Sequence, residues 1–77
     1  MYGLQEKQSS VLCTRLKRLR LTSRLTQRQV AEMLDIDRST YCYYETGKTQ
    51  SGIEALKQLS GLYHVSIDYI VGNTAKP

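Results

Sequence analysis

Apolar residues recur along this chain at intervals of three and four, which is the spacing of one face of an α-helix. We find no alternation of apolar and polar residues of the kind that is typical of a strand. The first apolar stripe predicts a helix that Ser9 or Ser10 caps and that ends at Leu21, after a flexible N-terminus at residues 1–8. Its members are Leu12, Leu16 and Leu19.

Several start signals agree on a second helix. Thr26 and Gln29 form a capping-box pattern, and Leu25 and Val30 occupy the positions of a hydrophobic staple. The inner face of this helix is then formed by Val30, Ala31 and Leu34. Agreement between caps and periodicity makes this the best-defined start in the chain.

A tight turn links that helix to a third. Asp35 tolerates the left-handed conformation that a short turn needs, although less readily than Gly, and Ile36 is expected to enter the core. Asp37 caps a helix at about 38–46, and its charge suits the positive end of the helix dipole. Gly47 is fitted to the left-handed position after the helix end.

Two further helices follow. Ser51 or Gly52 caps a fourth helix that ends at His64, and Ser66 caps a short fifth helix that ends before Gly72. The apolar stripe of the fourth helix consists of Ile53, Leu56, Leu59, Leu62 and Tyr63. The fold class is therefore expected to be all-α.

The 77 residues fit one small domain at residues 9–72, with a flexible tail at 73–77. The chain has no Trp and no Phe, so its core must come from Leu, Ile, Val and some of the six Tyr. Tyr41 and Tyr44 are three apart and are expected to face inward. Because each hydroxyl needs water or a partner, we expect both rings at the rim of the core.

The net charge of +4 is unevenly distributed. No acid lies between Glu6 and Glu32, and a basic run falls within that interval. The run consists of Arg15, Lys17, Arg18, Arg20, Arg24 and Arg28. A local positive field favours a polyanion, while a solvated helix face is the alternative reading.

Other classes of protein find less support. Cys13 and Cys42 lack metal or redox spacing and are expected to be free thiols in a reducing cytoplasm, with a disulfide as the alternative. The first residues lack the apolar block of a signal peptide, and no run approaches the roughly 18 apolar residues of a membrane span. We therefore expect a cytoplasmic chain. Because His64 is the single His, we expect no enzyme activity, no cofactor and no metal.

A further set of motifs appears in a fixed order. They are Gln27, Val30-Ala31, Leu34, Ser39-Thr40, Glu45-x-Gly47-Lys48, Ile53, Leu56 and Val65 to Ile70. In this order and spacing they resemble the lambda/434-repressor-like helix-turn-helix domains of the Cro/xenobiotic-response-element type, over roughly residues 11–72. The resemblance implies five helices, with the second and third forming the helix-turn-helix and the third entering the major groove of DNA.

The resemblance also implies roles for residues. Base reading falls to Arg38, Ser39 and Tyr43. Phosphate contacts fall to Gln27, Lys48 and the neighbouring Thr49, to which the basic run adds Arg28. Arg20 and Glu45 match an ion pair between the first and third helices.

Residue chemistry supports these roles but leaves alternatives open. Arg is the usual bidentate reader of guanine, so Arg38 suits base reading, with a phosphate or solvent contact as the alternative. Ser39 reads a base or simply belongs to the first turn of its helix. Tyr43 contacts a thymine methyl group or a phosphate, or has only a surface role.

The expected function is a sequence-specific DNA-binding transcriptional regulator, as a small prophage-type repressor whose homodimer binds a pseudo-palindromic operator. The expected dimer interface is the exposed apolar part of the fifth helix with the loop before it, for example Ile67, Tyr69, Ile70 or Val71. The alternative is a protein-interaction module, either antitoxin-like or an anti-repressor, with another protein as its partner. Asp35 and Asp37 favour this alternative, because acids close to DNA phosphates oppose binding.

Overall fold

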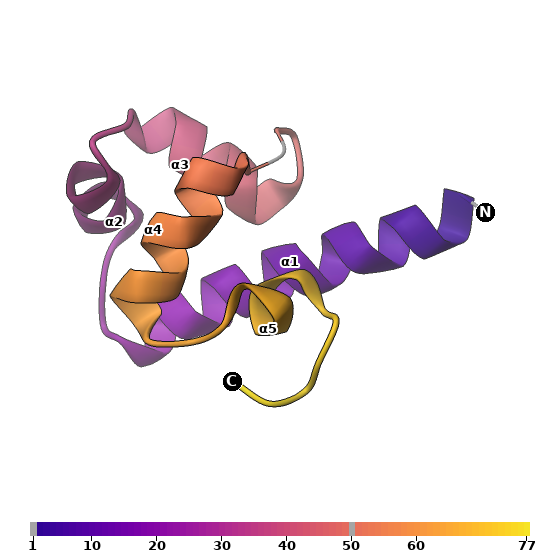
Figure 1. The fold of residues 1–77 in the computed structure, drawn as a ribbon. Helices are drawn as coiled ribbons and strands as arrows, with labels where there is room; N and C mark the ends of the chain where they lie inside the picture. The colour runs from indigo at the N-terminus through magenta and orange to yellow at the C-terminus, as the bar shows by residue number, and fades with distance from the viewer. Residues whose placement is uncertain (1, 50) are drawn as a thin grey trace.

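The computed structural model describes residues 2–49 and 51–77, with side chains from residue 11 onward. Within this part of the chain every regular element is a helix, which confirms the all-α class (Figure 1). The helices are α1 (Tyr2–Thr22), α2 (Gln27–Leu34), α3 (Arg38–Thr46), α4 (Ile53–Tyr63) and α5 (Ile67–Val71). None of these described helices combines the length and the apolar character that a membrane crossing requires.

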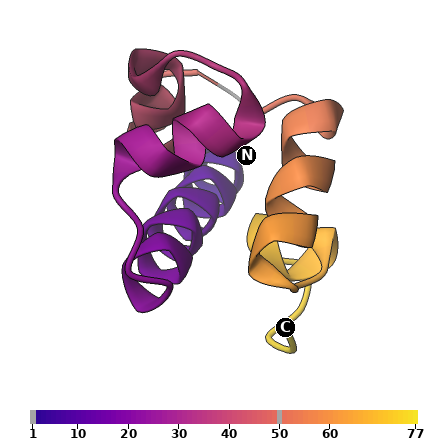
Figure 2. The ribbon, with the colours of Figure 1, turned by 90° about the vertical axis from the view of Figure 1, so that its left-hand side faces the viewer.

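Each helix contributes one fully buried residue to the centre of the fold. These are Leu16, Val30, Tyr41, Leu59 and Ile70, each 0% exposed. Helix α1 packs against α3 and α5, while α4 packs against α2 and α5. In the view of Figure 2, α2 and α3 lie on one side of the molecule and α4 and α5 on the other, and α1 runs beneath α2 and α3. The helix-turn-helix is therefore held from below by α1 and from the side by α4.

Helix α1 starts earlier than the sequence predicted. It begins at Tyr2 and not after Ser9 or Ser10, so residues 2–8 have helical backbone. Residues 4–22 contain neither Gly nor Pro, and most of them are good helix formers, so the two serines are accommodated inside the helix. The N-terminal half of α1 extends beyond the other four helices (Figure 1).

The caps of the middle helices match the predictions in part. The N–H of Gln29 donates to Thr26 Oγ1 at 3.1 Å and the N–H of Thr26 to Gln29 Oε1 at 2.8 Å, which confirms the capping box. Asp37 is the N-cap of α3, but its side chain accepts no capping hydrogen bond. Gly52, and not Ser51, occupies the N-cap of α4.

Four helices end in the same backbone motif. A left-handed residue follows each of them: Arg24 (φ 59°) comes two positions after α1, and Asp35 (φ 58°), His64 (φ 57°) and Gly72 (φ 91°) come directly after α2, α4 and α5. In each, the next N–H along the chain donates to the carbonyl five residues earlier at 2.8–3.1 Å, as in a Schellman motif. Three of these four positions hold a side chain where Gly is the usual residue, and Arg24 had given no signal of a helix end in the sequence.

Helix α5 is anchored to both the core and the C-terminal residues. Ile70, expected at a dimer interface, is fully buried, so that part of the prediction was wrong. The Arg15 guanidinium lies over the Tyr69 ring at 4.2 Å and donates to the Tyr69 carbonyl oxygen, and to that of Thr74 at 2.8 Å. An oxygen of Pro77 accepts a hydrogen bond from the Ser66 N–H at 2.9 Å, so residues 73–77 contact the domain.

Tyr41 lies at the centre of the core and not at its rim, so this prediction was wrong. Its hydroxyl lies 3.4 Å from the hydroxyl of Tyr63 on α4, and this partner replaces the water that a rim position would have supplied. Tyr44 packs edge-on against Tyr41, with ring centroids 6.2 Å apart, and is 8% exposed. Cys13 and Cys42 are both free thiols and half-buried.

Candidate nucleic-acid interface

An open hollow of about 920 Å³ connects the end of α1, the start of α2 and the start of α3. Five cationic side chains line it: Lys17, Arg20, Arg24, Arg28 and Arg38. The other lining residues are Leu21, Leu25, Thr26 and Gln27, so no acid lines the hollow. We call this surface the basic hollow. Several like charges on a concave wall concentrate a positive potential that attracts a polyanion.

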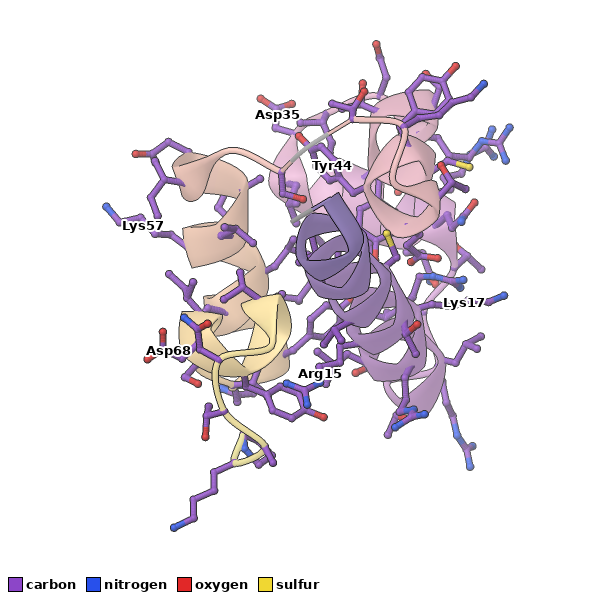
Figure 3. All side chains as sticks on the ribbon, turned by 90° about the vertical axis from the view of Figure 1, so that its right-hand side faces the viewer. Arg15, Lys17, Asp35, Tyr44, Lys57 and Asp68 are labelled. Atoms are coloured by element: carbon purple, nitrogen blue, oxygen red, sulfur yellow. The ribbon has the colours of Figure 1, made fainter. Side chains whose placement is uncertain are left out.

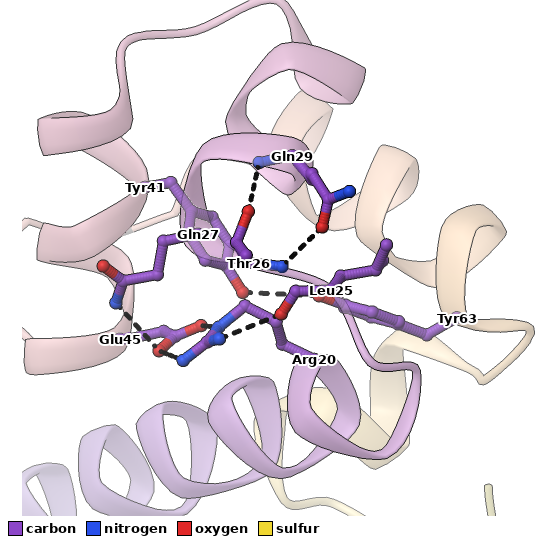
Figure 4. Close-up of polar contacts among 8 residues, drawn as sticks. All are labelled: Arg20, Leu25, Thr26, Gln27, Gln29, Tyr41, Glu45 and Tyr63. Carbon is purple, nitrogen blue, oxygen red and sulfur yellow. Dashed lines mark hydrogen bonds and ion pairs between the residues drawn. The ribbon is translucent and has the colours of Figure 1, made fainter.

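The start of α2 forms one wall of the basic hollow. Arg28 is exposed there, and the first N–H groups of any helix have no partner within the helix. The Gln27 side chain is half-buried, and its amide donates to Glu45 Oε1 at 3.2 Å (Figure 4). Gln27 is therefore already oriented by α3, which limits the positions that its side chain can take in the hollow.

The exposed face of α3 begins at the same hollow. Arg38 and Ser39 are exposed in its first turn, and Arg38 lines the hollow together with Gln27 and Arg28. Tyr43 is four positions after Ser39, so these two side chains share one helix face. The structure thus brings Arg38 together with the start of α2, while Tyr43 lies further along α3.

The far end of α3 holds a second pair of candidate residues. Tyr43 is 40% exposed, and the Nζ atom of Lys48 lies 5.4 Å from the centre of its ring. Thr49, next in the chain, is also exposed. A cation this close to an aromatic face is attracted to it, so Lys48 and Tyr43 restrain each other.

A buried ion pair lies behind these surfaces. Arg20 donates through Nε to Glu45 Oε2 at 2.7 Å and through Nη2 to Oε1 at 3.2 Å (Figure 4). Arg20 Nη1 also donates to the carbonyl oxygen of Leu25 at 3.0 Å, just before the capping box. Both charged residues are only 9% exposed. The pair therefore fixes α1, the entry to α2 and α3 relative to one another.

The protonation of Glu45 is set by its neighbours. Burial alone would raise the pKa of this carboxyl group, but hydrogen bonds from Arg20, Tyr41 and Gln27 outweigh burial and hold the pKa below its usual value. The hydrogen bond to Glu45 likewise raises the pKa of the Arg20 guanidinium. Both groups are charged at neutral pH.

Sequence reasoning missed the extension of this network to α4. Burial is the main reason that the pKa of Tyr41 and that of Tyr63 are both raised, so both hydroxyls are protonated and can donate. The inward spacing of the two tyrosines on their own helices was visible, but nothing in that spacing showed that their hydroxyl groups meet.

The two aspartates of the turn lie outside the basic hollow. Asp35 and Asp37, with Ile36 and Thr40, line a separate hollow of about 400 Å³ that has no cationic residue in its lining. The two acids therefore belong to a different surface hollow from the five cations, although Asp37 directly precedes Arg38 in the chain.

Two short capped helices joined by a tight turn, the second with an exposed polar face, define a helix-turn-helix domain. Residues 16–70 match the family model described as Helix-turn-helix. The chain therefore belongs to the helix-turn-helix family of proteins.

Relatives from Bacillus subtilis share this region. The uncharacterized HTH-type transcriptional regulator YobD of Bacillus subtilis (strain 168) is 42% identical over 65 residues, 84% of this chain and 58% of that protein. The SPbeta prophage-derived uncharacterized HTH-type transcriptional regulator YonR, from the same strain, is 35% identical over 60 residues, 78% of this chain and 56% of that protein.

A solved structure shares the fold as well as the sequence. The crystal structure of a transcriptional regulator from Listeria innocua has a TM-score of 0.75 and 38% identity, and the match covers 79% of this chain and 57% of that one. The chain thus spans a little over half the length of these proteins.

Proposed function

We propose that this chain is a sequence-specific DNA-binding regulator of transcription that acts in the cytoplasm. The observation that carries the proposal is the basic hollow, because it joins the start of α2 to Arg38, the first residue of the exposed face of α3. One polyanionic ligand can then contact the hollow and the helix face together. The names of YobD and YonR as transcriptional regulators support the same conclusion.

In this proposal α3 enters the major groove and reads bases through Arg38, Ser39 and Tyr43. Arg38 stands at the N-terminal end of the helix, and Arg pairs with the O6 and N7 atoms of guanine. Ser39 contributes a small hydrogen-bonding group beside it. Tyr43 offers its ring to a thymine methyl group, in an orientation restrained by Lys48.

Phosphate contacts flank the base-reading face. Gln27 and Arg28 hold one phosphate at the start of α2, where free N–H groups and the helix dipole favour an anion. Lys48 and Thr49 hold another after the end of α3, where both are exposed. Contacts on both sides of α3 fix its orientation in the groove without reading sequence.

We further propose a prophage-type repressor that acts as a homodimer on a pseudo-palindromic operator. The description of YonR as prophage-derived supports this assignment. One short helix reads few bases, and a two-fold dimer would place two such helices about 34 Å apart, one turn of DNA. Because Ile70 is buried, the remaining candidates for an interface on α5 are the half-buried Ile67, Tyr69 and Val71.

Selection of bound sequences from random DNA tests the whole proposal. A regulator of this kind will enrich two related half-sites with a fixed spacing of about one DNA turn. A single enriched half-site would contradict the dimer alone. The absence of any enriched sequence would contradict sequence-specific binding.

Replacing Arg38 by Ala will relax sequence specificity at one base pair of the selected site. Losing a bidentate contact to guanine lowers discrimination against the wrong base by about 1–3 kcal/mol. Competition binding with the selected site and its single-base variants measures this discrimination. The matched control is Lys57→Ala, because Lys57 extends from α4 on the opposite side of the molecule from Lys17 (Figure 3). Unchanged discrimination in Arg38→Ala would refute the assigned role.

A protein-interaction module is the second candidate function. The acidic hollow at Asp35 and Asp37 favours it, together with Met33 on α2, which is 57% exposed. An exposed Met side chain suits a protein partner better than it suits DNA. This candidate would be favoured if the selection enriches no DNA sequence and if any binding to DNA does not weaken as the salt concentration rises.

A further inference from the structure

We infer that Arg24, with Lys17, forms an additional phosphate subsite that holds the DNA backbone beyond the contact at the start of α2. The inference rests on the proposed function and extends it. It adds a binding site at the end of α1, outside the helix-turn-helix itself.

The structure separates the members of the basic run by their partners. Among the described side chains the only ion pair is that of Arg20 with Glu45. Arg15 is engaged by the carbonyl oxygens of Tyr69 and Thr74, next to α5. These two arginines therefore have structural partners, and neither is available to hold a phosphate without losing one.

Arg18 lies on a different surface. It lines two smaller hollows along α1, together with residues such as Thr14, and is not part of the basic hollow. Lys17 lines the basic hollow and one of the smaller ones, so it stands at their shared edge. Arg24 lines the basic hollow and none of the smaller hollows described, and no acid lies in the lining of the basic hollow. Arg24 and Lys17 are thus the cations at the α1 end of the hollow that have no acidic partner among the described side chains.

The backbone at Arg24 supports the same assignment. Its φ of 59° places it in the left-handed region, at the position of the Schellman motif that Gly occupies most easily. A residue with a side chain is strained there, and Arg24 is exposed, so packing does not explain the side chain. With this left-handed turn, Arg24 lies in the lining of the basic hollow.

The extent of the hollow identifies the kind of ligand. Its cations run from the end of α1, through the start of α2, to the start of α3. One small anion would contact only part of this surface, whereas a DNA strand presents phosphates at regular intervals along it. Arg28 and the start of α2 would hold one phosphate, and Arg24 with Lys17 the next one outward.

The substitution Arg24→Gly tests the inference without unfolding the protein, because Gly adopts the left-handed conformation without strain. Affinity for the selected operator and for unrelated DNA is measured over a range of salt concentrations. Loss of one phosphate contact lowers the slope of log affinity against log salt by about 0.9, and it weakens binding to both DNAs by the same factor. Lys17→Gln will lower the slope in the same way. The unfolding midpoint of Arg24→Gly is expected to be no lower than that of the wild type.

Two control variants separate the subsite from general effects. His64→Gly relieves the same backbone strain at a residue outside the basic hollow, and Lys57→Gln removes one positive charge from α4. Both should keep the wild-type slope to within a few tenths. If Arg24→Gly also keeps the wild-type slope and affinity, the subsite is refuted while DNA binding stands. If the wild type itself shows no salt-dependent binding to DNA, the proposed function and the subsite are both refuted.

Discussion

Replacing Glu45 by Leu will lower the free energy of unfolding by about 3–5 kcal/mol, because it leaves the buried Arg20 guanidinium without its counter-charge. Arg20 and Glu45 are each only 9% exposed, so water cannot take the place of the lost carboxylate. A domain of 77 residues has a total stability of about 4–12 kcal/mol. The variant will therefore be close to unfolding at room temperature, as urea titration followed by circular dichroism will measure.

The matched control for this prediction is Glu32→Leu. Glu32 is an exposed acid on α2, and its replacement should change stability by no more than about 0.5 kcal/mol. The double variant Arg20→Met with Glu45→Leu should recover much of the lost stability, because a buried ion pair can be replaced by apolar side chains at little loss. A single Glu45→Leu variant that unfolds at the wild-type midpoint would show that the pair contributes little.

The same pair makes the domain sensitive to acid. The pKa of Glu45 in the folded state lies below its ordinary value. At pH values between the folded and the unfolded pKa, the folded state therefore binds fewer protons than the unfolded state. The stabilisation is fully present above the unfolded pKa, near 4.5, and it is lost as the pH falls below that value toward the folded pKa. The double variant lacks this carboxylate and should lose less stability between neutral pH and acid than the wild type does.

Local signals accounted for most of the fold. The capping box at Thr26, the left-handed Asp35 and the closing Gly47 each depend on a few neighbouring residues, and each is present in the structure. The start of α1 was missed because serine is common at N-caps but is also tolerated inside a helix whose other residues favour it. The left-handed Arg24 was missed because Gly is the usual residue at that position of a Schellman motif.

The candidate site was less accessible to sequence reasoning, since its parts meet only in three dimensions. The contact of Arg20 with Glu45 followed from the resemblance to a known family and is present at 2.7 Å. The basic run was visible in the sequence, but the sequence did not show which of its residues have structural partners and which line the basic hollow. Arg15 contacts residues next to α5 and Arg24 lines the basic hollow, and both placements depend on how the helices pack. Periodicity alone carries no such information.

Tyr41 illustrates the same limit in the core, and it leads to the second large effect. Replacing Tyr41 by Ala will lower the free energy of unfolding by about 3–5 kcal/mol, as for other buried aromatic residues. The side chain is 0% exposed and packs between the edge of Tyr44 and the hydroxyl of Tyr63. Chemical denaturation measures the loss, and Tyr43→Ala, which removes a 40% exposed ring, should lower stability by no more than about 1 kcal/mol.

The hydroxyl contribution can be separated from that of the ring. Tyr41→Phe keeps the ring but leaves the Tyr63 hydroxyl unpaired in a buried site, which costs about 1–3 kcal/mol. In the double variant Tyr41→Phe with Tyr63→Phe neither hydroxyl is left unpaired, so the double variant should be no less stable than Tyr41→Phe alone. Since the Tyr41 hydroxyl also donates to Glu45, an additive loss in the double variant would show that the Tyr63 hydroxyl has a partner other than Tyr41. In that case the contact between α3 and α4 would rest on ring packing, and the hydroxyl pair would not be what holds Tyr41 at the centre of the core.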